Sequence, residues 1–311
     1  MPPITAMLAG DSNPPEAFAM RLAFALVFLL PSVVQAQLHI AAMTTHGGAK
    51  LRIGTRTVGD VDLLDCIIER YEGDWAWIHN QDGQAGWVKR GDVVPMSQAI
   101  GYFTRKIGAE PRNGEWYHWR AGAWRYRGEL DLALADENEA IRFSPSEAGY
   151  WSNRGNIYAD KKDYDRALAD YNQALHLNQD ALYWYNAWSA RHKKGDYEKA
   201  LSNCDRAISL DPKYALAFNG RAWTWATARD SHFRNGQKAI DSARRACELS
   251  DWQEAEFLDT LAAAYAEAGD FDNAVRYQKQ ATGLLPADAA VRRPDFAEHL
   301  RLFESGKPLR E

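Results

Sequence analysis

The sequence is poor in cysteine: its 311 residues include only Cys66, Cys204 and Cys247. The three lie far apart and form neither a CxxC pair nor a zinc-ligand spacing, so we expect them to be small buried side chains. The eight histidines also stand at no metal-ligand spacing from one another or from a cysteine. The sequence therefore predicts no metal and no cofactor.

Recognisable catalytic motifs are missing too. The chain has no GxSxG, no phosphate-binding glycine loop and no HExxH. Carboxylates are abundant, but they fall on expected helix faces and turns that water covers, as at Glu137 and Glu139. A net charge of −5 supplies no concentrated basic stripe for nucleic acid. We therefore predict neither an enzyme nor a nucleic-acid-binding protein.

Large aromatic rings, by contrast, are plentiful. The chain has 12 Trp, 14 Tyr and 11 Phe within a hydrophobic fraction of 46%. A chain of this composition can bury a core, which excludes wholesale disorder. Its rings are expected either to fill that core or to line a recognition surface.

The first 36 residues have the pattern of a targeting segment. Met20-Arg21 is followed by the apolar run Leu22–Leu30 and by a small-residue end that closes at Ala36. This order predicts a signal peptide that begins at Met20 and is cleaved after Ala36, and hence a periplasmic or secreted protein. The run is too short for a comfortable membrane span, so no transmembrane segment is expected after cleavage. An uncleaved anchor and a chance apolar stretch are the alternatives.

Between residues 37 and 95 the hydrophobic pattern changes to short alternating runs separated by Gly and Asp, which predicts a small all-β barrel or sandwich. The run GDWAWIHNQDGQAGWVKRGDVVP, residues 73–95, resembles the second half of a bacterial SH3-like domain. The resemblance implies docking of peptides or cell-wall strands on exposed rings, with Trp75, Trp77 and Trp87 as candidates. The alternative, which we favour for at least two of the three, is that these rings form the core of a very small module.

The strongest feature is self-similarity at a spacing of about 34 residues. Five units carry two alanines seven residues apart: Ala133 and Ala140, Ala167 and Ala174, Ala200 and Ala207, Ala239 and Ala246, and Ala274 and Ala281. The turns before these pairs contain Gly128, Lys162, Gly195, Asn235-Gly236 and Gly269, and three units close with Pro145, Pro212 and Pro286. Runs such as SNRGNIYADKKDYDRALADYNQALHLN, residues 152–178, closely resemble the tetratricopeptide repeat.

The resemblance implies two helices per unit, stacked on the next unit into an α-solenoid. A turn glycine permits a left-handed helix cap, the paired alanines let helices approach closely, and the closing proline ends the second helix. We predict a half-repeat helix and connection at 96–113, five repeats at 114–291, and a capping helix and tail at 292–311. The lengthened turn of the fourth unit, around Ala226–Arg234, is either a binding loop or a neutral insertion.

First helices of this family line a concave groove at fixed positions. Carried over residue by residue, those positions are His118, Gly122, Arg125, Ser152, Asn156, Tyr185, Ser189, His192, Asn219, Trp223 and Asp259. Tyr185 and Trp223 are the candidate peptide anchors, because aromatic rings dominate interface energies. The alternative at each position is a residue that merely tolerates solvent. The family's basic clamp for a terminal carboxylate is not matched, since Arg191, Lys193 and Arg221 lie near its positions but not at them.

Together these features predict a mainly α protein, a tetratricopeptide-type α-solenoid preceded by a small all-β SH3-like barrel. We expect an exported, non-catalytic bacterial scaffold that binds a protein or peptide partner in its groove. The alternative is a cell-wall-associated protein whose SH3-like module docks peptidoglycan or a wall peptide, with the solenoid as a spacer.

Overall fold

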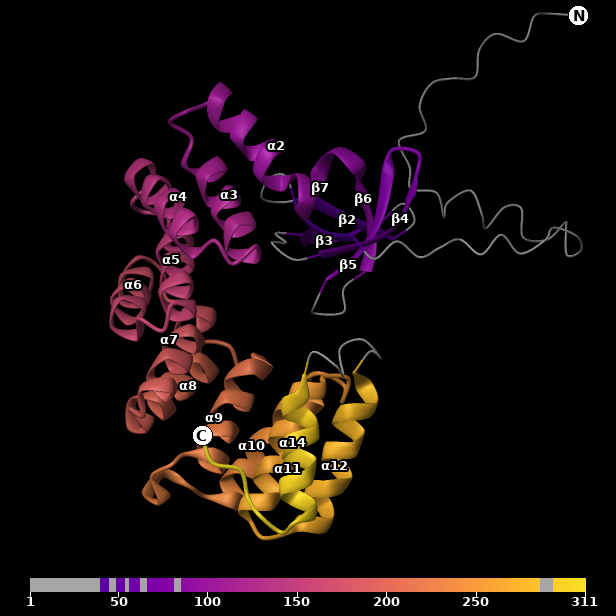
Figure 1. Ribbon diagram of the computed structural model, residues 1–311, viewed down its shortest axis with the longest axis vertical. Coiled ribbons are helices and arrows are strands. Elements are labelled where there is room, and N and C mark those ends of the chain that lie inside the picture. The colour runs from indigo at the N-terminus through magenta and orange to yellow at the C-terminus, as the bar shows by residue number, and fades with distance from the viewer. Residues whose placement is uncertain (1–39, 45–48, 54–55, 62–65, 81–84, 286–292) are drawn as a thin grey trace, which may run out of the picture. The chain divides into compact units, whose positions relative to one another are not determined.

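The computed structural model describes residues 40–44, 49–53, 56–61, 66–80, 85–285 and 293–311 (Figure 1). The predicted signal peptide, its cleavage site and Pro286 lie outside these residues. The chain divides into two compact units, one that ends at Phe143 and one from Ser144 to Glu311.

The first unit contains one seven-stranded antiparallel sheet in the order β3-β2-β6-β5-β4-β1-β7. Its strands are β1 (Ile40–Thr44), β2 (Ala49–Ile53), β3 (Arg56–Val61), β4 (Cys66–Glu72), β5 (Trp75–Asn80), β6 (Ala85–Lys89) and β7 (Val93–Pro95). A left-handed glycine, Gly73, joins β4 to β5, and the short helix η1 (Arg90–Asp92) joins β6 to β7. The sheet is the β module that the alternating pattern predicts.

Side chains that alternate along β5 and β6 separate the two faces of the sheet. Ala76, Ile78 and Val88 belong to a buried cluster on one face. On the other face, Trp87 is fully buried and Trp75 is 6% exposed. Trp77 is half-buried, and its ring meets that of Trp87 edge-on at 5.2 Å between centroids. Two of the three candidate rings are therefore core side chains.

Three helices complete the first unit: α2 (Met96–Ala109), α3 (Gly114–Tyr126) and α4 (Leu130–Phe143). Helix α2 begins at the residue that follows β7, so no linker separates it from the sheet. Phe103 of α2 is fully buried and stacks on Trp116 and Trp119 of α3. Met43 of the sheet belongs to the same cluster, so the sheet and the first helices share a core.

The second unit consists of helices that pair in sequence (Figure 1). They are α5 (Ala148–Asp160), α6 (Tyr164–Leu177), α7 (Ala181–Lys194), α8 (Tyr197–Leu210), α9 (Ala215–Thr227), the short η2 (Ser231–Phe233), α10 (Gly236–Leu249), α11 (Ala255–Glu267), α12 (Phe271–Leu284) and α14 (Pro294–Glu304). The predicted fold class is confirmed: the chain is mainly α-helical, with helix-turn-helix units after a small antiparallel sheet.

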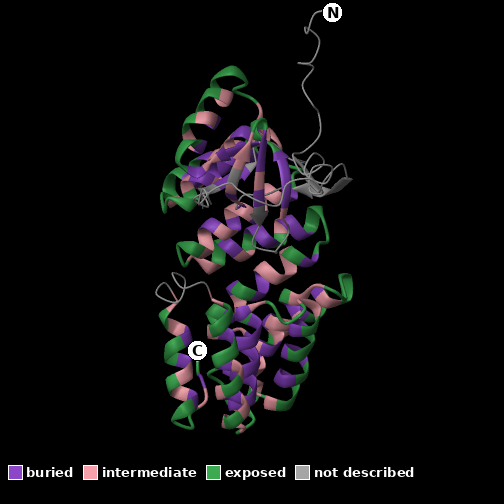
Figure 2. Cartoon of the chain, turned by 90° about the vertical axis from the view of Figure 1, so that its right-hand side faces the viewer, coloured by how far each residue is buried: buried purple, intermediate pink, exposed green. Residues whose placement is uncertain are grey.

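Close packing between helices follows from the paired alanines. All ten have no exposed surface, and they lie on α4, α6, α8, α10 and α12, the second helix of each unit. A side chain of one methyl group lets two helix backbones approach, and burying it costs no rotamer entropy. Buried residues therefore concentrate on the faces that helices turn toward each other (Figure 2).

Left-handed residues join the two helices of several units. Gly128, Gly195 and Gly269 have φ of 78°, 78° and 81°, as predicted. Lys162 occupies the corresponding place in the second repeat with φ of 61°, although it carries a Cβ. These residues satisfy the last carbonyls of the first helix; for example, the Lys162 amide donates to Ala159 O at 2.8 Å.

The prediction of a left-handed cap is wrong at Gly236. This residue begins α10, and its N-cap is Asn235, whose side chain accepts from the Lys238 amide. A Cβ on Gly236 would lie 2.7 Å from the backbone N and Cα of Ala268, at the end of α11. Glycine is needed here for the close approach of two backbones, rather than for φ.

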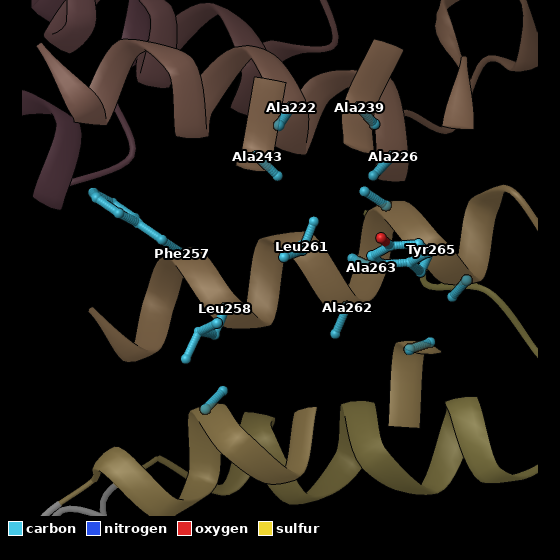
Figure 3. Close-up of a cluster of buried hydrophobic side chains, with 14 of the residues drawn as sticks. Ala222, Ala226, Ala239, Ala243, Phe257, Leu258, Leu261, Ala262, Ala263 and Tyr265 are labelled. Carbon is cyan, nitrogen blue, oxygen red and sulfur yellow. The ribbon is translucent and has the colours of Figure 1, made fainter. Parts of the chain in front are cut away.

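Helix α11 is buried on nearly all sides, as expected for a helix that is apolar all round. In Figure 3, Leu261 points toward Ala222 and Ala243, which come from α9 and α10. Leu258 and Ala262 point the opposite way. Helix α11 is thus the centre of the largest cluster described, which includes Leu309 of the tail.

Candidate functional site

A cavity of about 300 Å³ lies in the second unit between the first helices of three successive repeats. It is lined by Trp188, Ser189, His192 and Lys193 of α7, Asn219 and Trp223 of α9, Glu256, Asp259 and Thr260 of α11, and by Arg293, Asp295, His299 and Glu311. The structure therefore brings together five of the predicted groove residues: Ser189, His192, Asn219, Trp223 and Asp259.

His192 is held in one orientation by a buried threonine. The Thr224 hydroxyl donates to Gly220 O at 3.0 Å and accepts from Trp188 Nε1 at 3.0 Å. Its second lone pair faces His192 Nδ1 at 3.1 Å. A hydroxyl has one proton to give, so Nδ1 of His192 is the donor in this contact. The other ring nitrogen, Nε2, faces the Glu311 carboxylate at 3.7 Å.

The Glu311 carboxylate occupies the centre of this arrangement. Its Oε2 accepts from Trp223 Nε1 at 2.9 Å and from Lys193 Nζ at 3.2 Å. Pairing with His192, with further contributions from Trp223 and Lys193, outweighs partial burial and lowers the pKa of Glu311 to about 2. The site thus holds an ionised carboxylate with an imidazole, an indole N–H and an ammonium group.

The chain beside this carboxylate is held by its backbone. The Glu311 amide donates to Thr227 O at 3.0 Å, and the Tyr197 hydroxyl donates to Glu311 O at 3.3 Å. Figure 1 shows this end of the chain beside α9. A second cavity of about 420 Å³ adjoins Glu311 and is bordered by Lys194, Tyr197 and Arg229, among others.

The opposite wall of the first cavity is tied to the capping helix. Asp259 Oδ1 lies 2.8 Å from His299 Nδ1 and accepts from Gln278 Nε2 at 2.7 Å. Burial lowers the pKa of His299. The hydrogen bond and charge of Asp259, together with the charges of Asp295 and Glu311, raise it by more, so the net shift is upward. Asp259 therefore joins α11, α12 and α14.

The other predicted groove residues lie elsewhere. In the first unit, His118 Nδ1 lies 2.8 Å from Glu137 Oε1, and Arg125 is exposed. In the second unit, Asn156 accepts from the Tyr171 hydroxyl at 2.8 Å. Tyr185 stacks on Trp188, with 5.0 Å between ring centroids, and burial raises its pKa to about 12. None of these four lines the 300 Å³ cavity.

Lys193 and Glu311 are site residues that the sequence analysis did not place. Lys193 follows a groove position directly, and its charge beside His192 was the available signal. Glu311 lies 88 residues from Trp223 along the chain. The repeat pattern contains no information about a contact of that range, because repeats specify packing between neighbours only.

Three further features bear on chemistry. Cys66, Cys204 and Cys247 are buried, and burial raises the pKa of Cys247 to about 12. Across the described residues, no three His, Cys, Asp or Glu side chains gather as metal ligands would. Among the helices of the described ranges, none has the length and apolar character needed to cross a membrane.

Family comparisons agree with these helix pairs. The model described as tetratricopeptide repeat matches residues 148–181, 181–214 and 255–288, which hold α5–α6, α7–α8 and α11–α12. The chain contains tetratricopeptide repeats. These matches fall on the second, third and fifth predicted units, and two of them supply first helices that line the cavity. Among curated proteins, no sequence matches the chain.

Solved structures with tetratricopeptide-like solenoids have the same fold. The structure of the APC/C hetero-tetramer Cut9-Hcn1 is similar with a TM-score of 0.57 and 17% identity, over 67% of this chain and 39% of that chain. PilW, described as a widely conserved type IV pilus biogenesis factor, gives 0.55 and 17%, over 66% and 89%. Yeast Tom70 gives 0.53 and 16%, over 67% and 42%. At these identities the likeness concerns the fold alone.

Proposed function

We propose that this protein is a non-catalytic scaffold that binds a peptide segment of a partner protein on the inner surface of α7, α9 and α11. Proteins built of tetratricopeptide repeats generally act as protein-interaction scaffolds. The observation that carries the proposal is the cavity itself. Polar donors from α7 and α9 converge there around the Glu311 carboxylate, beside the Thr227 carbonyl, which accepts a peptide N–H from Glu311.

An array of random peptides tests this function directly. We expect the full chain to bind a subset of the peptides. A Glu311→Gln variant, which lacks the side-chain carboxylate of residue 311, should bind the same subset. Trp223→Ala should weaken that binding about tenfold or more, because aromatic anchors dominate interface energy. Trp225→Ala is the matched control, since this ring lies two residues along α9 and packs on Arg221 and Lys238 outside the cavity. The proposal fails if no peptide binds, or if both tryptophan variants bind equally well.

Export belongs to the proposal as well. The support is the order of a basic residue, an apolar run and a small-residue end that closes at Ala36. Expression in a bacterial host, with fractionation and N-terminal sequencing of the mature chain, should recover Gln37 as the first residue. Recovery of the intact chain from the cytoplasm would refute export.

Wall docking is the weaker candidate function. It rests on the resemblance of residues 73–95 to an SH3-like domain, and of its three candidate rings only Trp77 keeps partial exposure. Cosedimentation of the full chain with purified cell wall, compared with Trp77→Ala, distinguishes this function from peptide binding. Equal cosedimentation of both proteins would show that Trp77 does not bind the cell wall.

A further inference from the structure

We propose that residues 309–311 are an internal ligand of the α7–α9–α11 cavity, and that the partner segment which replaces them carries an apolar side chain two positions before an acidic one. This inference rests on the proposed function and specifies the ligand of the same site. It follows from three kinds of contact that the segment makes.

The first contact requires a carboxylate. Trp223 Nε1 and Lys193 Nζ both point to one oxygen of Glu311, and His192 Nε2 lies 3.7 Å from it. All three are donors, or become donors when protonated. A carboxamide could offer only its carbonyl oxygen to them and would leave the ammonium charge without a counter-charge. The arrangement therefore selects an acidic side chain.

The second contact is independent of sequence. Thr227 O accepts the Glu311 amide, and the Tyr197 hydroxyl donates to the Glu311 carbonyl. Any peptide placed in the same register offers both groups, because every residue except proline has an amide N–H and a carbonyl. These two bonds fix the position of the acidic residue along the inner surface.

The third contact requires an apolar side chain. Leu309 is 9% exposed and belongs to the core cluster around α11. The side chain of Arg310, the residue between Leu309 and Glu311, is 35% exposed, and its Nη2 lies 2.6 Å from Glu267 Oε2. Leu309 thus lies in the core cluster, whereas Glu311, two residues later, lines the cavity.

The lengthened turn of the fourth repeat, between α9 and α10, takes part in this site. The last two residues of α9, where this turn begins, supply backbone acceptors, Ala226 O for Arg310 and Thr227 O for Glu311. The last residue of the turn, Arg234, lies 3.2 Å from the same Glu267 that Arg310 meets, and it donates to Ala228 O. The insertion thus shapes the place where residues 309–311 lie, which favours the binding role over a neutral insertion.

Displacement of the segment is feasible because much of it stays in contact with water. The side chains of Lys193 and Glu311 are 51% and 36% exposed, and ion pairs at such exposure contribute little net stability. A tethered segment nevertheless competes at a high effective concentration. A partner segment can therefore bind these residues only when the contacts of residues 309–311 are weakened or broken.

The test uses a fluorescein-labelled peptide of residues 305–311, SGKPLRE, amidated at its C-terminus so that only the side chain supplies an acid. Anisotropy should show about tenfold or tighter binding to the full-length Glu311→Gln variant than to the wild type, because the internal competitor is weakened. Glu304→Gln is the matched control: it removes the same charge from α14, where Glu304 pairs with Lys279 outside the cavity. It should leave binding unchanged.

Two changes to the peptide test the recognition rule. Replacing its Glu by Gln, or its Leu by Asn, should each weaken binding to the Glu311→Gln protein about tenfold. Equal binding of all three peptides would overturn the inference, as would equal binding of SGKPLRE to wild type and variant. If array peptides bind at Trp223 but SGKPLRE does not, the proposed function stands and this inference fails. If no peptide binds in either experiment, the proposed function fails with it.

Discussion

Lys162 is a residue held in a conformation that suits glycine. It has φ of 61° at a turn where the units on either side use Gly128 and Gly195. A side chain in the left-handed region costs about 1–2 kcal/mol, which is partly offset because glycine is freer in the unfolded chain. Since the Lys162 side chain is exposed, Lys162→Gly should raise the free energy of unfolding by about 0.5 kcal/mol, measured by urea denaturation.

The neighbouring lysine provides the control for this change. Lys161 has φ of −76°, where a Cβ is unstrained. Lys161→Gly should therefore lower stability by about 0.5–1 kcal/mol. Equal effects of the two substitutions would show that φ at residue 162 carries no cost.

Buried ion pairs join the two helices of a repeat. Arg154 Nη2 lies 2.7 Å from Asp170 Oδ1, with side chains 18% and 7% exposed. Arg120 and Asp136 make the same pair one repeat earlier. Arg154→Ala should destabilise the second unit by about 3–5 kcal/mol, because it leaves a buried carboxylate without its counter-charge. Calorimetry or urea denaturation measures the loss.

An exposed pair gives the comparison. Arg142 pairs with Glu139 on the surface of α4, with side chains 59% and 40% exposed. Arg142→Ala should change stability by no more than about 1 kcal/mol. If Arg154→Ala had an equally small effect, Asp170 would have to find water or a proton in the folded state.

The alanine pairs and the buried ion pairs differ in how far the sequence predicts them. The alanine pairs were predictable, because close helix approach at a fixed repeat position demands a small side chain. The pair of Arg154 and Asp170 was not, because its members lie 16 residues apart on different helices. Their meeting depends on side-chain reach across a packed interface, which the pattern of apolar residues does not encode.

At the scale of helices, the packing of α10 against the end of α11 depends on one glycine. A Cβ on Gly236 would lie 2.7 Å from backbone atoms of Ala268, which cannot move as a flexible side chain would. Gly236→Ala should therefore lower the free energy of unfolding by about 1–3 kcal/mol despite the better helix propensity of alanine. Thermal or urea unfolding of the variant measures the effect.

Gly283 of α12 separates this clash from propensity. Nothing lies within 4 Å of a Cβ placed there. Gly283→Ala should raise stability by about 0.5–1 kcal/mol through helix propensity alone. A stabilising effect at both glycines would mean that α10 and α11 shift apart at little cost.

Helix order and pairing were predictable because each unit repeats the same signals: a small residue at the crossing and a turn residue before it. The role of Gly236 was misread since glycine serves both positive φ and close approach, and sequence does not tell the two apart. The tail contact was also beyond prediction. Residues 309–311 follow the capping helix α14 and meet α7 and α9, which are distant along the chain.

At the scale of the whole second unit, the cavity couples residues from three repeats and the tail, and this coupling makes stability depend on pH. The charges of Asp259, Asp295 and Glu311 help to raise the pKa of His299 against the opposing effect of burial. A histidine whose pKa is raised by folding stabilises the protein fully below its unfolded pKa of about 6.5. That stability is lost as pH rises through the higher folded value.

The free energy of unfolding of the second unit should accordingly fall above pH 6.5, with a slope from His299 of at most about 1.4 kcal/mol per pH unit. His299→Gln should flatten this slope, whereas His176→Gln, at an exposed position on α6, should leave it unchanged. Glu311→Gln should lower the His299 pKa, read from its ring signals by NMR, since it removes one of the three charges. An unchanged His299 titration in that variant would show that residue 311 does not occupy the cavity in solution, and the internal-ligand model would fail with it.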